Sequence, residues 1–227
     1  MTSLLNRLST IAAVLFVVGP GLAHFGLLPP LGGFVTFALG GLLALIAFVR
    51  GLIGLARGKG ADGGLILAGA LGLIFVVAAA PGRKVPRIND ITTDTQNPPQ
   101  FAHAQSLPAN QGRDMSYPGT SFAEQQLAGY GPLEGHHLNM APDEAFQRVV
   151  TATKALTGAE VTQTDAARRT LEGVATSKLF RFQDDFVVEV RPAGDGSIVQ
   201  MRSKSRDGKG DFGVNAARIR ALFEHLG

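Results

Sequence analysis

The 227-residue chain contains no cysteine, no tryptophan and only two tyrosines, Tyr117 and Tyr130. Without cysteine there are no disulfides, zinc–thiolate sites, iron–sulfur clusters or thiol nucleophiles. Without tryptophan, and with so little tyrosine, the aromatic girdle that flanks many membrane segments is missing. These absences exclude several classes of metal and redox protein, but they place the chain in no particular compartment.

Charge is scarce in the first third of the chain. The charged residues before Pro81 are Arg7, Arg50, Arg57, Lys59 and Asp62, whereas the remainder holds 17 basic and 17 acidic residues. The sequence pI of about 9.5 therefore comes from a few cations beside apolar segments. Nucleic-acid binders instead cluster Lys and Arg on one face. We expect no nucleic-acid partner.

Three apolar runs dominate residues 1–80, at about 8–28, 31–49 and 64–80. A membrane-spanning helix needs roughly 20 mostly apolar residues, with about 17 as the lower limit. The sequence therefore predicts three transmembrane helices, the first two joined by a tight turn at Pro29–Pro30. A cleaved signal peptide is the alternative for the first run, but it lacks a small-residue cleavage site and two further runs follow it.

The cations in short loops predict an orientation in the membrane. The loop after the second run and the N-terminal flank carry four cations, which the positive-inside rule places in the cytoplasm. With three spans, the C-terminal domain then lies on the periplasmic side. Three cations directly after the third run oppose this orientation: Arg83, Lys84 and Arg87.

Small residues recur every four positions in two of the runs, so each set shares one helix face. They are Thr36, Gly40 and Ala44 in the second run and Gly64, Ala68 and Gly72 in the third. Such faces let helix backbones approach closely. The three helices pack on one another through them, or else the faces dock onto a larger membrane complex.

Residues 81–141 are rich in Pro, Gln, Asn and Gly, and we interpret them as an irregular linker that wraps a soluble domain at residues 142–227. Pro142 begins a predicted helix that Gly158 ends. Alternating apolar residues then predict strands at 160–165, 169–177, 186–191 and 197–203. Turns are expected at 183–185 and 194–196.

A last amphipathic helix is predicted at 214–226. Because short turns join the strands, the sheet is expected to be antiparallel, with two helices covering one face. The fold class is therefore α+β: three N-terminal transmembrane helices followed by a small antiparallel sheet covered by two helices.

Three segments together resemble a known family. They are Asn89–Asp94 with Pro98–Phe101, then Phe180–Asp185, then Arg202–Gly208 with Asp211–Asn215 and Arg218–Arg220. In this order they resemble domain-of-unknown-function family 1499, whose bacterial members often carry N-terminal membrane spans. The resemblance covers about Arg87 to Leu226. It implies a bacterial membrane protein and no activity. With the predicted spans and the loop cations, we expect a multi-pass protein of the inner membrane with a periplasmic domain.

The stretch from the last strand into the last helix is the best candidate site. It combines cations with a glycine-rich loop and a helix N-terminus, which suit a phosphate or carboxylate. On strand alternation, the three cations share one side and the two serines the other. The candidate residues are Arg202, Ser203, Lys204, Ser205, Arg206, Asp211, Asn215 and Arg218. The alternative is that Asp211 caps the helix while Asn215 and Arg218 fasten the loop.

Other polar groups indicate no catalytic set. We assign Asp184 and Asp185 to a turn, and the adjacent His136 and His137 do not converge on a metal with any third ligand. The chain has neither a Gly-x-Ser-x-Gly elbow nor a Gly-x-x-x-x-Gly-Lys phosphate loop. The sequence therefore predicts no catalytic residues, no metal and no cofactor.

Three functions are compatible with these features. The first is a non-enzymatic, membrane-anchored interaction or assembly subunit that docks on a larger membrane protein complex. The second is a domain that binds lipid headgroups or small anions at the membrane surface. The third, for which we find no nucleophile with a base, is an uncharacterised hydrolase. The expected partners are membrane lipids and a larger membrane protein complex.

Overall fold

The computed structural model describes residues 4–60, 63–80, 82 and 85–227. Arg83 and Lys84, two of the cations that oppose the predicted orientation, lie outside the described residues, as does Asp62. The chain divides into two compact units. One contains the N-terminal helices together with residues 178–181, and the other contains the remaining residues up to 227.

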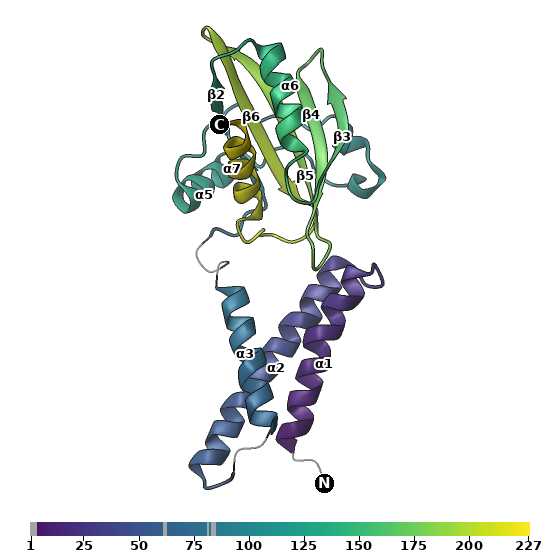
Figure 1. Cartoon of the computed structure of the whole chain (residues 1–227), viewed down its shortest axis with the longest axis vertical. Helices are drawn as coiled ribbons and strands as arrows, with labels where there is room; N and C mark the ends of the chain where they lie inside the picture. The colour runs from purple at the N-terminus through teal and green to yellow at the C-terminus, as the bar shows by residue number, and fades with distance from the viewer. Residues whose placement is uncertain (1–3, 61–62, 81, 83–84) are drawn as a thin grey trace. The chain divides into compact units, whose positions relative to one another are not determined.

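The first unit is built from three apolar helices, α1 (Leu4–His24), α2 (Pro30–Ala56) and α3 (Gly63–Ala79) (Figure 1). By length and composition α1 and α2 are able to cross a membrane, whereas α3 is a shorter apolar helix of 17 residues. Pro30 stands in the first turn of α2, where its missing N–H breaks no helical hydrogen bond. Beyond the predicted end at residue 49, α2 continues to Ala56 because no proline interrupts it.

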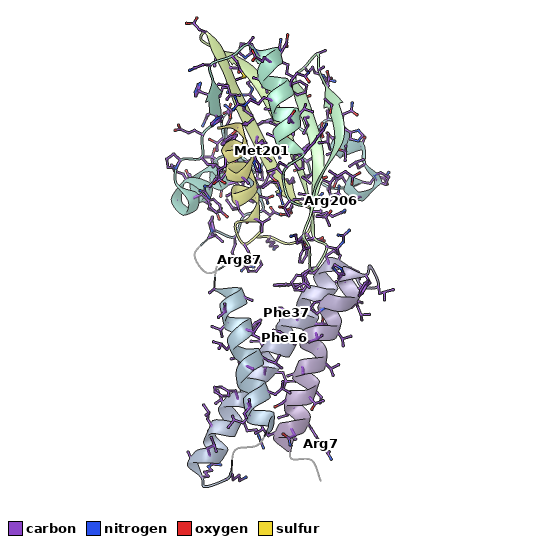
Figure 2. The ribbon with its side chains drawn as sticks, viewed as in Figure 1. Arg7, Phe16, Phe37, Arg87, Met201 and Arg206 are labelled. Atoms are coloured by element: carbon purple, nitrogen blue, oxygen red, sulfur yellow. The ribbon has the colours of Figure 1, made fainter. Side chains whose placement is uncertain are left out.

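The helices of this unit interlock closely. The Phe16 and Phe37 rings meet between α1 and α2 with centroids 4.4 Å apart (Figure 2). A Cβ atom on Gly40 would lie 2.6 Å from the backbone nitrogen of Phe16, so only glycine permits this approach. Ser9 of α1 donates a 2.8 Å hydrogen bond to the carbonyl of Gly64 in α3.

The second unit contains a six-stranded, fully antiparallel sheet, which confirms the α+β class. In spatial order the strands are β1 (Asp90–Thr92), β6 (Gly196–Ser205), β5 (Gln183–Ala193), β4 (Thr170–Thr176) and β3 (Ala159–Asp165), while β2 (His136–Leu138) also pairs with β6. The turn Gly194–Asp195 joins β5 to β6, as predicted, and Gly194 has φ of 56°.

Two of the strands come from the segment predicted to be an irregular linker. Strands β1 and β2 lie there, together with α4 (His103–Ser106), the 3₁₀ turn η2 (Pro108–Asn110) and α5 (Thr120–Tyr130). Strands of three residues are too short to display alternation, so the sequence pattern did not predict them. Residues 85–141 therefore form part of the folded domain.

One face of the sheet carries the apolar core. Helices α6 (Pro142–Thr153) and α7 (Val214–Leu226) both cover this face (Figure 1). Pro142 occupies the first turn of α6 with Asp143 and Glu144 at its positive end. The fully buried apolar side chains include Phe146, Val149, Leu171, Phe186, Val188, Val199, Met201, Ile219 and Leu222.

Candidate functional site

The opposite face of the sheet is polar, and residues 93–118 cover it. Strand alternation directs Arg202 and Lys204 of β6, and Arg206 directly after it, toward this face, and directs Ser203 and Ser205 toward α7. A small apolar cluster of Phe101, Ala104 and Met115 on Val187 completes the cover. The predicted basic stretch is therefore split between the two faces.

Asp90 of β1 binds two of the three cations. Arg202 donates from Nε to Oδ1 and from Nη2 to Oδ2 of Asp90, both at 2.8 Å, and Lys204 Nζ lies 2.8 Å from the same Oδ2. Asp90 and Arg202 are fully buried. The guanidinium also lies over the ring of Phe101, 4.8 Å from its centroid. This fork geometry is the strong form of a charge-assisted pair.

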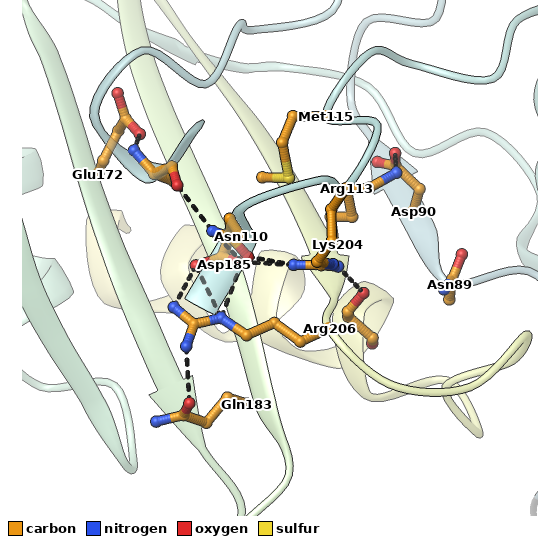
Figure 3. Close-up of polar contacts among 12 residues, drawn as sticks. Asn89, Asp90, Asn110, Arg113, Met115, Glu172, Gln183, Asp185, Lys204 and Arg206 are labelled. Atoms are coloured by element: carbon orange, nitrogen blue, oxygen red, sulfur yellow. Dashed lines mark hydrogen bonds and ion pairs between the residues drawn. The ribbon is translucent and has the colours of Figure 1, made fainter. Parts of the chain in front are cut away.

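Asp185 of β5 forms a second charged centre (Figure 3). Arg206 donates from Nη2 at 2.7 Å and from Nε at 3.0 Å, and Arg113 Nη1 approaches to 3.3 Å. The amide of Asn110 adds a bond of 3.1 Å. Arg206 also donates to Gln183 Oε1 at 2.7 Å. A buried aspartate in β5 thus connects β6 to residues 110–113.

Glu172 of β4 fixes the start of α4. Its carboxylate accepts hydrogen bonds from the backbone N–H groups of Ala102, His103 and Ala104, at 2.9, 2.8 and 2.7 Å. These are N–H groups that a helix start leaves without an intrahelical acceptor. The side chain is only 4% exposed, so a nearly buried carboxylate attaches the covering segment to the sheet.

On the α7 side, the remaining candidates fasten the last helix to the sheet. Asn215 exchanges hydrogen bonds with Ser203 and Ser205, at 2.7 and 2.9 Å. Arg218 pairs with Asp184 of β5 at 2.6 Å. Asp211 accepts from the backbone N–H groups of Gly213 and Asn215 at the start of α7, at 2.9 and 2.8 Å. Each of these contacts is internal to the domain.

The expectation that Asp184 and Asp185 form a turn is wrong. Both lie in β5, paired with Ala175 and Val174 of β4, and consecutive strand residues point to opposite faces. Asp184 therefore meets α7, while Asp185 meets Arg113 and Arg206. Aspartate favours turns, and that propensity misled the prediction because the compensating cations lie far away in sequence.

Sequence reasoning also missed six residues that complete these ion pairs and hydrogen bonds. These are Asp90, Asn110, Arg113, Glu172, Asp184 and Asp185. A signal for half of them was present, since Asp90, Asp184 and Asp185 stand in segments that carry the family resemblance. Strands β1, β5 and β6 bring together the three segments that carry the family resemblance, and the charged residues of these segments pair with one another.

A polar groove of about 490 Å³ lies beside this network. The loop before α4 forms one wall and the ends of β4 and β5 form the other. Its lining residues include Gln96, Asn97, Gln100, Arg168, Thr170, Glu189 and Arg191. It is the part of the polar face that residues 93–118 leave accessible.

Ionisation in and near the groove follows from local contacts. Arg191 donates to Asp94 and to Glu189, each at 2.7 Å. Burial opposes ionisation of Asp94, but N–H bonds from Asn97 and Gln96 and the guanidinium of Arg191 outweigh it, so the pKa of Asp94 is lowered. Burial, reinforced by the Asp90 carboxylate, raises the pKa of Tyr117 to about 12.

The six small residues predicted for helix packing lie at contacts between the helices. Ala44 and Ala68 are fully buried, and Gly40 lies on the backbone of α1. A Cβ on Gly72 would lie 2.8 Å from Leu45, and Gly64 lies against Asn6. Thr36 bonds the carbonyl of Gly33 within α2. The small residues of each helix face its neighbours, so the large apolar side chains on the remaining helix surface point outward.

The fold and the site define a class: an α+β domain with a charge-paired sheet face, preceded in the chain by apolar helices. The family model described as "Protein of unknown function (DUF1499)" matches residues 90–226, and the chain belongs to that family. The match begins at β1, so the family unit includes most of the supposed linker. No curated protein shows significant similarity to the chain.

Proposed function

We propose that the chain is a non-enzymatic, membrane-anchored interaction or assembly subunit in the bacterial inner membrane. Helices α1, α2 and α3 span the bilayer, and the sheet domain lies on the periplasmic side and contacts a larger membrane protein complex. The observation that carries the anchor is the outward face of the helices, which is covered by large apolar side chains.

That face favours a membrane anchor over the alternatives. Only 28% of the apolar window of either α1 or α2 is buried, whereas the core helix of a soluble protein is mostly covered. Val17, Ile46 and Leu73 are 62–65% exposed, one on each helix. Apolar surface this extensive requires lipid or protein around it. A removable signal sequence has no reason to interlock with α2 and α3, as α1 does at Gly40 and Gly64.

The polar groove supports an interaction role for the sheet domain. The amides of Gln96 and Gln100 and the guanidinium of Arg168 are exposed there, which suits hydrogen bonding to a polar segment of a partner protein. The anion-binding alternative loses support at the basic stretch, because Arg202, Lys204 and Arg206 are paired with the chain's own aspartates. No observation on the described residues favours the hydrolase alternative.

Two measurements test the proposal. The tagged full chain, expressed in bacterial membranes, is expected to stay in the pellet after an alkaline carbonate wash, and release into the wash would contradict the anchor. After extraction in mild detergent, a stoichiometric partner is expected to co-purify with the unaltered chain and with the control Lys154→Ala. The groove variant Gln100→Ala/Arg168→Ala is expected to lose it. A monomer in every preparation would refute the assembly role.

A further inference from the structure

A second concavity lies within the helical unit. It has a volume of about 910 Å³ and is lined by the start of α1 and the C-terminal half of α2. Leu4 and Leu5 line it from α1, and Ile46, Val49 and Ile53 line it from α2. These side chains make an apolar groove at the helix end where α1 begins and α2 stops.

Three cations line the same groove: Arg50, Arg57 and Lys59. Arg50 and Arg57 are seven residues apart, so two helical turns place them on the same face of α2. None of the described lining residues is acidic, and no hydrogen bond or ion pair joins these three side chains to a described residue. Asp62 follows closely in sequence and lies outside the described residues.

The end of α2 directs Lys59 back toward the groove. Gly58 has φ of 77° and donates to the carbonyl of Leu55 at 2.9 Å, while the N–H of Lys59 reaches the carbonyl of Gly54 at 3.0 Å. This pair of bonds is the Schellman arrangement. The lysine stem then lies beside Gly54, since a Cβ there would be 3.8 Å from Lys59 Cδ.

Simpler explanations account for part of this arrangement. Cations just beyond the C-terminus of a helix complement its dipole, which suits Arg57 and Lys59. Arg50 lies two turns from the end, beyond the range of that effect. The positive-inside rule explains cations at this end of the helices but not the apolar concavity between them. The combination of apolar walls with a cationic rim points to a ligand that has one apolar part and one anionic part.

We propose that this groove binds an anionic phospholipid of the leaflet at this end of the helices. Arg50 and Arg57 hold the phosphate, Lys59 adds charge at the rim, and Leu4, Leu5 and Ile46 contact an acyl chain. Guanidinium groups recognise phosphate by paired N–H donors, and cationic pockets between helices select acidic headgroups. The inference rests on the proposed membrane anchor.

Native mass spectrometry of the full chain tests the proposal. The chain is presented with an equimolar mixture of dioleoyl phosphatidylglycerol and dioleoyl phosphatidylcholine in detergent. We expect the first bound lipid to be phosphatidylglycerol, with a roughly tenfold preference over phosphatidylcholine, because two cations lie near the headgroup. Arg50→Gln/Arg57→Gln is expected to bring that preference close to one. Lys154→Gln/Lys209→Gln, which removes the same charge from the other unit, is expected to retain it.

Four outcomes would overturn the proposal. They are equal binding of both lipids by the unaltered chain, a preference that survives in Arg50→Gln/Arg57→Gln, an equal loss in the control, and displacement of the lipid by excess inorganic phosphate. The last would indicate a site for free anions. The unaltered chain and the same variants are also tested for retention in the carbonate-washed pellet, which reports on the anchor alone. Equal binding of both lipids by an unaltered chain that stays in the pellet would therefore contradict this proposal and leave the proposed anchor intact.

Discussion

The two faces of the sheet in the second unit are held by different forces. On one face α6 and α7 cover Leu171, Phe186 and Met201, all fully buried, and the contact is apolar. On the other face residues 93–118 cover Asp90 and Asp185, also fully buried, and the contact consists largely of ion pairs and hydrogen bonds. Water is excluded from these residues on both faces, but by different means.

The difference teaches how each face depends on its partners. The free energy gained by apolar burial is proportional to the buried area and does not depend on direction. An apolar face is therefore stabilised by many small contributions. A buried ion pair costs several kcal/mol to desolvate and repays that cost only in good geometry. Losing one member of the polar face should therefore have a large local effect, although the intact network adds little net stability.

The largest expected effect is that of Asp90→Ala. It leaves Arg202 fully buried and unpaired, and breaking a buried pair typically costs about 3–5 kcal/mol. The measurement is calorimetric unfolding of the full chain in detergent. Asp195→Ala, in the exposed β5–β6 turn, is the control and should change stability by less than about 0.5 kcal/mol. A loss below about 1 kcal/mol for Asp90→Ala would mean that water reaches the pair.

Phe146→Ala tests the apolar face. Removing this buried ring should cost about 3–5 kcal/mol through lost transfer energy and the cavity left behind. The substitution changes no ionisable group, so this loss should not vary between pH 5 and pH 9. Calorimetry of the variant and the unaltered chain across that range measures the loss, and a pH-dependent loss would contradict an apolar contact.

Glu172→Gln should have an intermediate effect. The amide keeps one oxygen acceptor but loses the charge that binds three N–H groups, and hydrogen bonds to charged groups contribute about 1.5–3 kcal/mol. We expect that loss together with faster backbone exchange at residues 102–104, measured by hydrogen exchange and mass spectrometry. Unchanged exchange there would show that α4 is held by its apolar contacts alone.

The smallest effect is expected from Asp94→Asn. Because the pKa of Asp94 is lowered in the fold, its ionised form stabilises the protein above the unfolded pKa of about 4, and this stability is lost as pH falls through the folded pKa. The pair with Arg191 is partly exposed, so the contribution is at most about 1 kcal/mol. Unfolding temperatures between pH 2 and pH 6 should decline less steeply in the variant than in the unaltered chain.

The apolar face was predictable from sequence because its signals are local. The alternation Phe186, Val188, Val190 and the helical spacing of Ile219, Leu222 and Leu226 each lie within a dozen residues. Pro142 marked where α6 begins, whereas the helix ends at Thr153, before the predicted stop at Gly158. The resulting prediction of four strands and two helices on one face agrees with β3 to β6, α6 and α7.

The polar face was not predictable because its contacts are long-range. Asp90 pairs with Arg202 across 112 positions, and no periodicity relates the two. The cations predicted to take an external anion are paired with carboxylates from β1 and β5, one of which the turn propensity of aspartate had concealed. Strands β1 and β2 were missed for a related reason, since the three residues of each carry no pattern of their own.

Residues 93–118 are fastened to the sheet at several points, among them Asp94 on Arg191, the start of α4 on Glu172, and Arg113 on Asp185. Arg202 also donates to the carbonyls of Pro99 and Met115. Apolar cover is limited to a small cluster, so the segment has few non-directional contacts to retain it once these bonds open. It should therefore behave as a separate cooperative unit, with an opening free energy below that of global unfolding. Its release would uncover a charged sheet face while the apolar core stays intact.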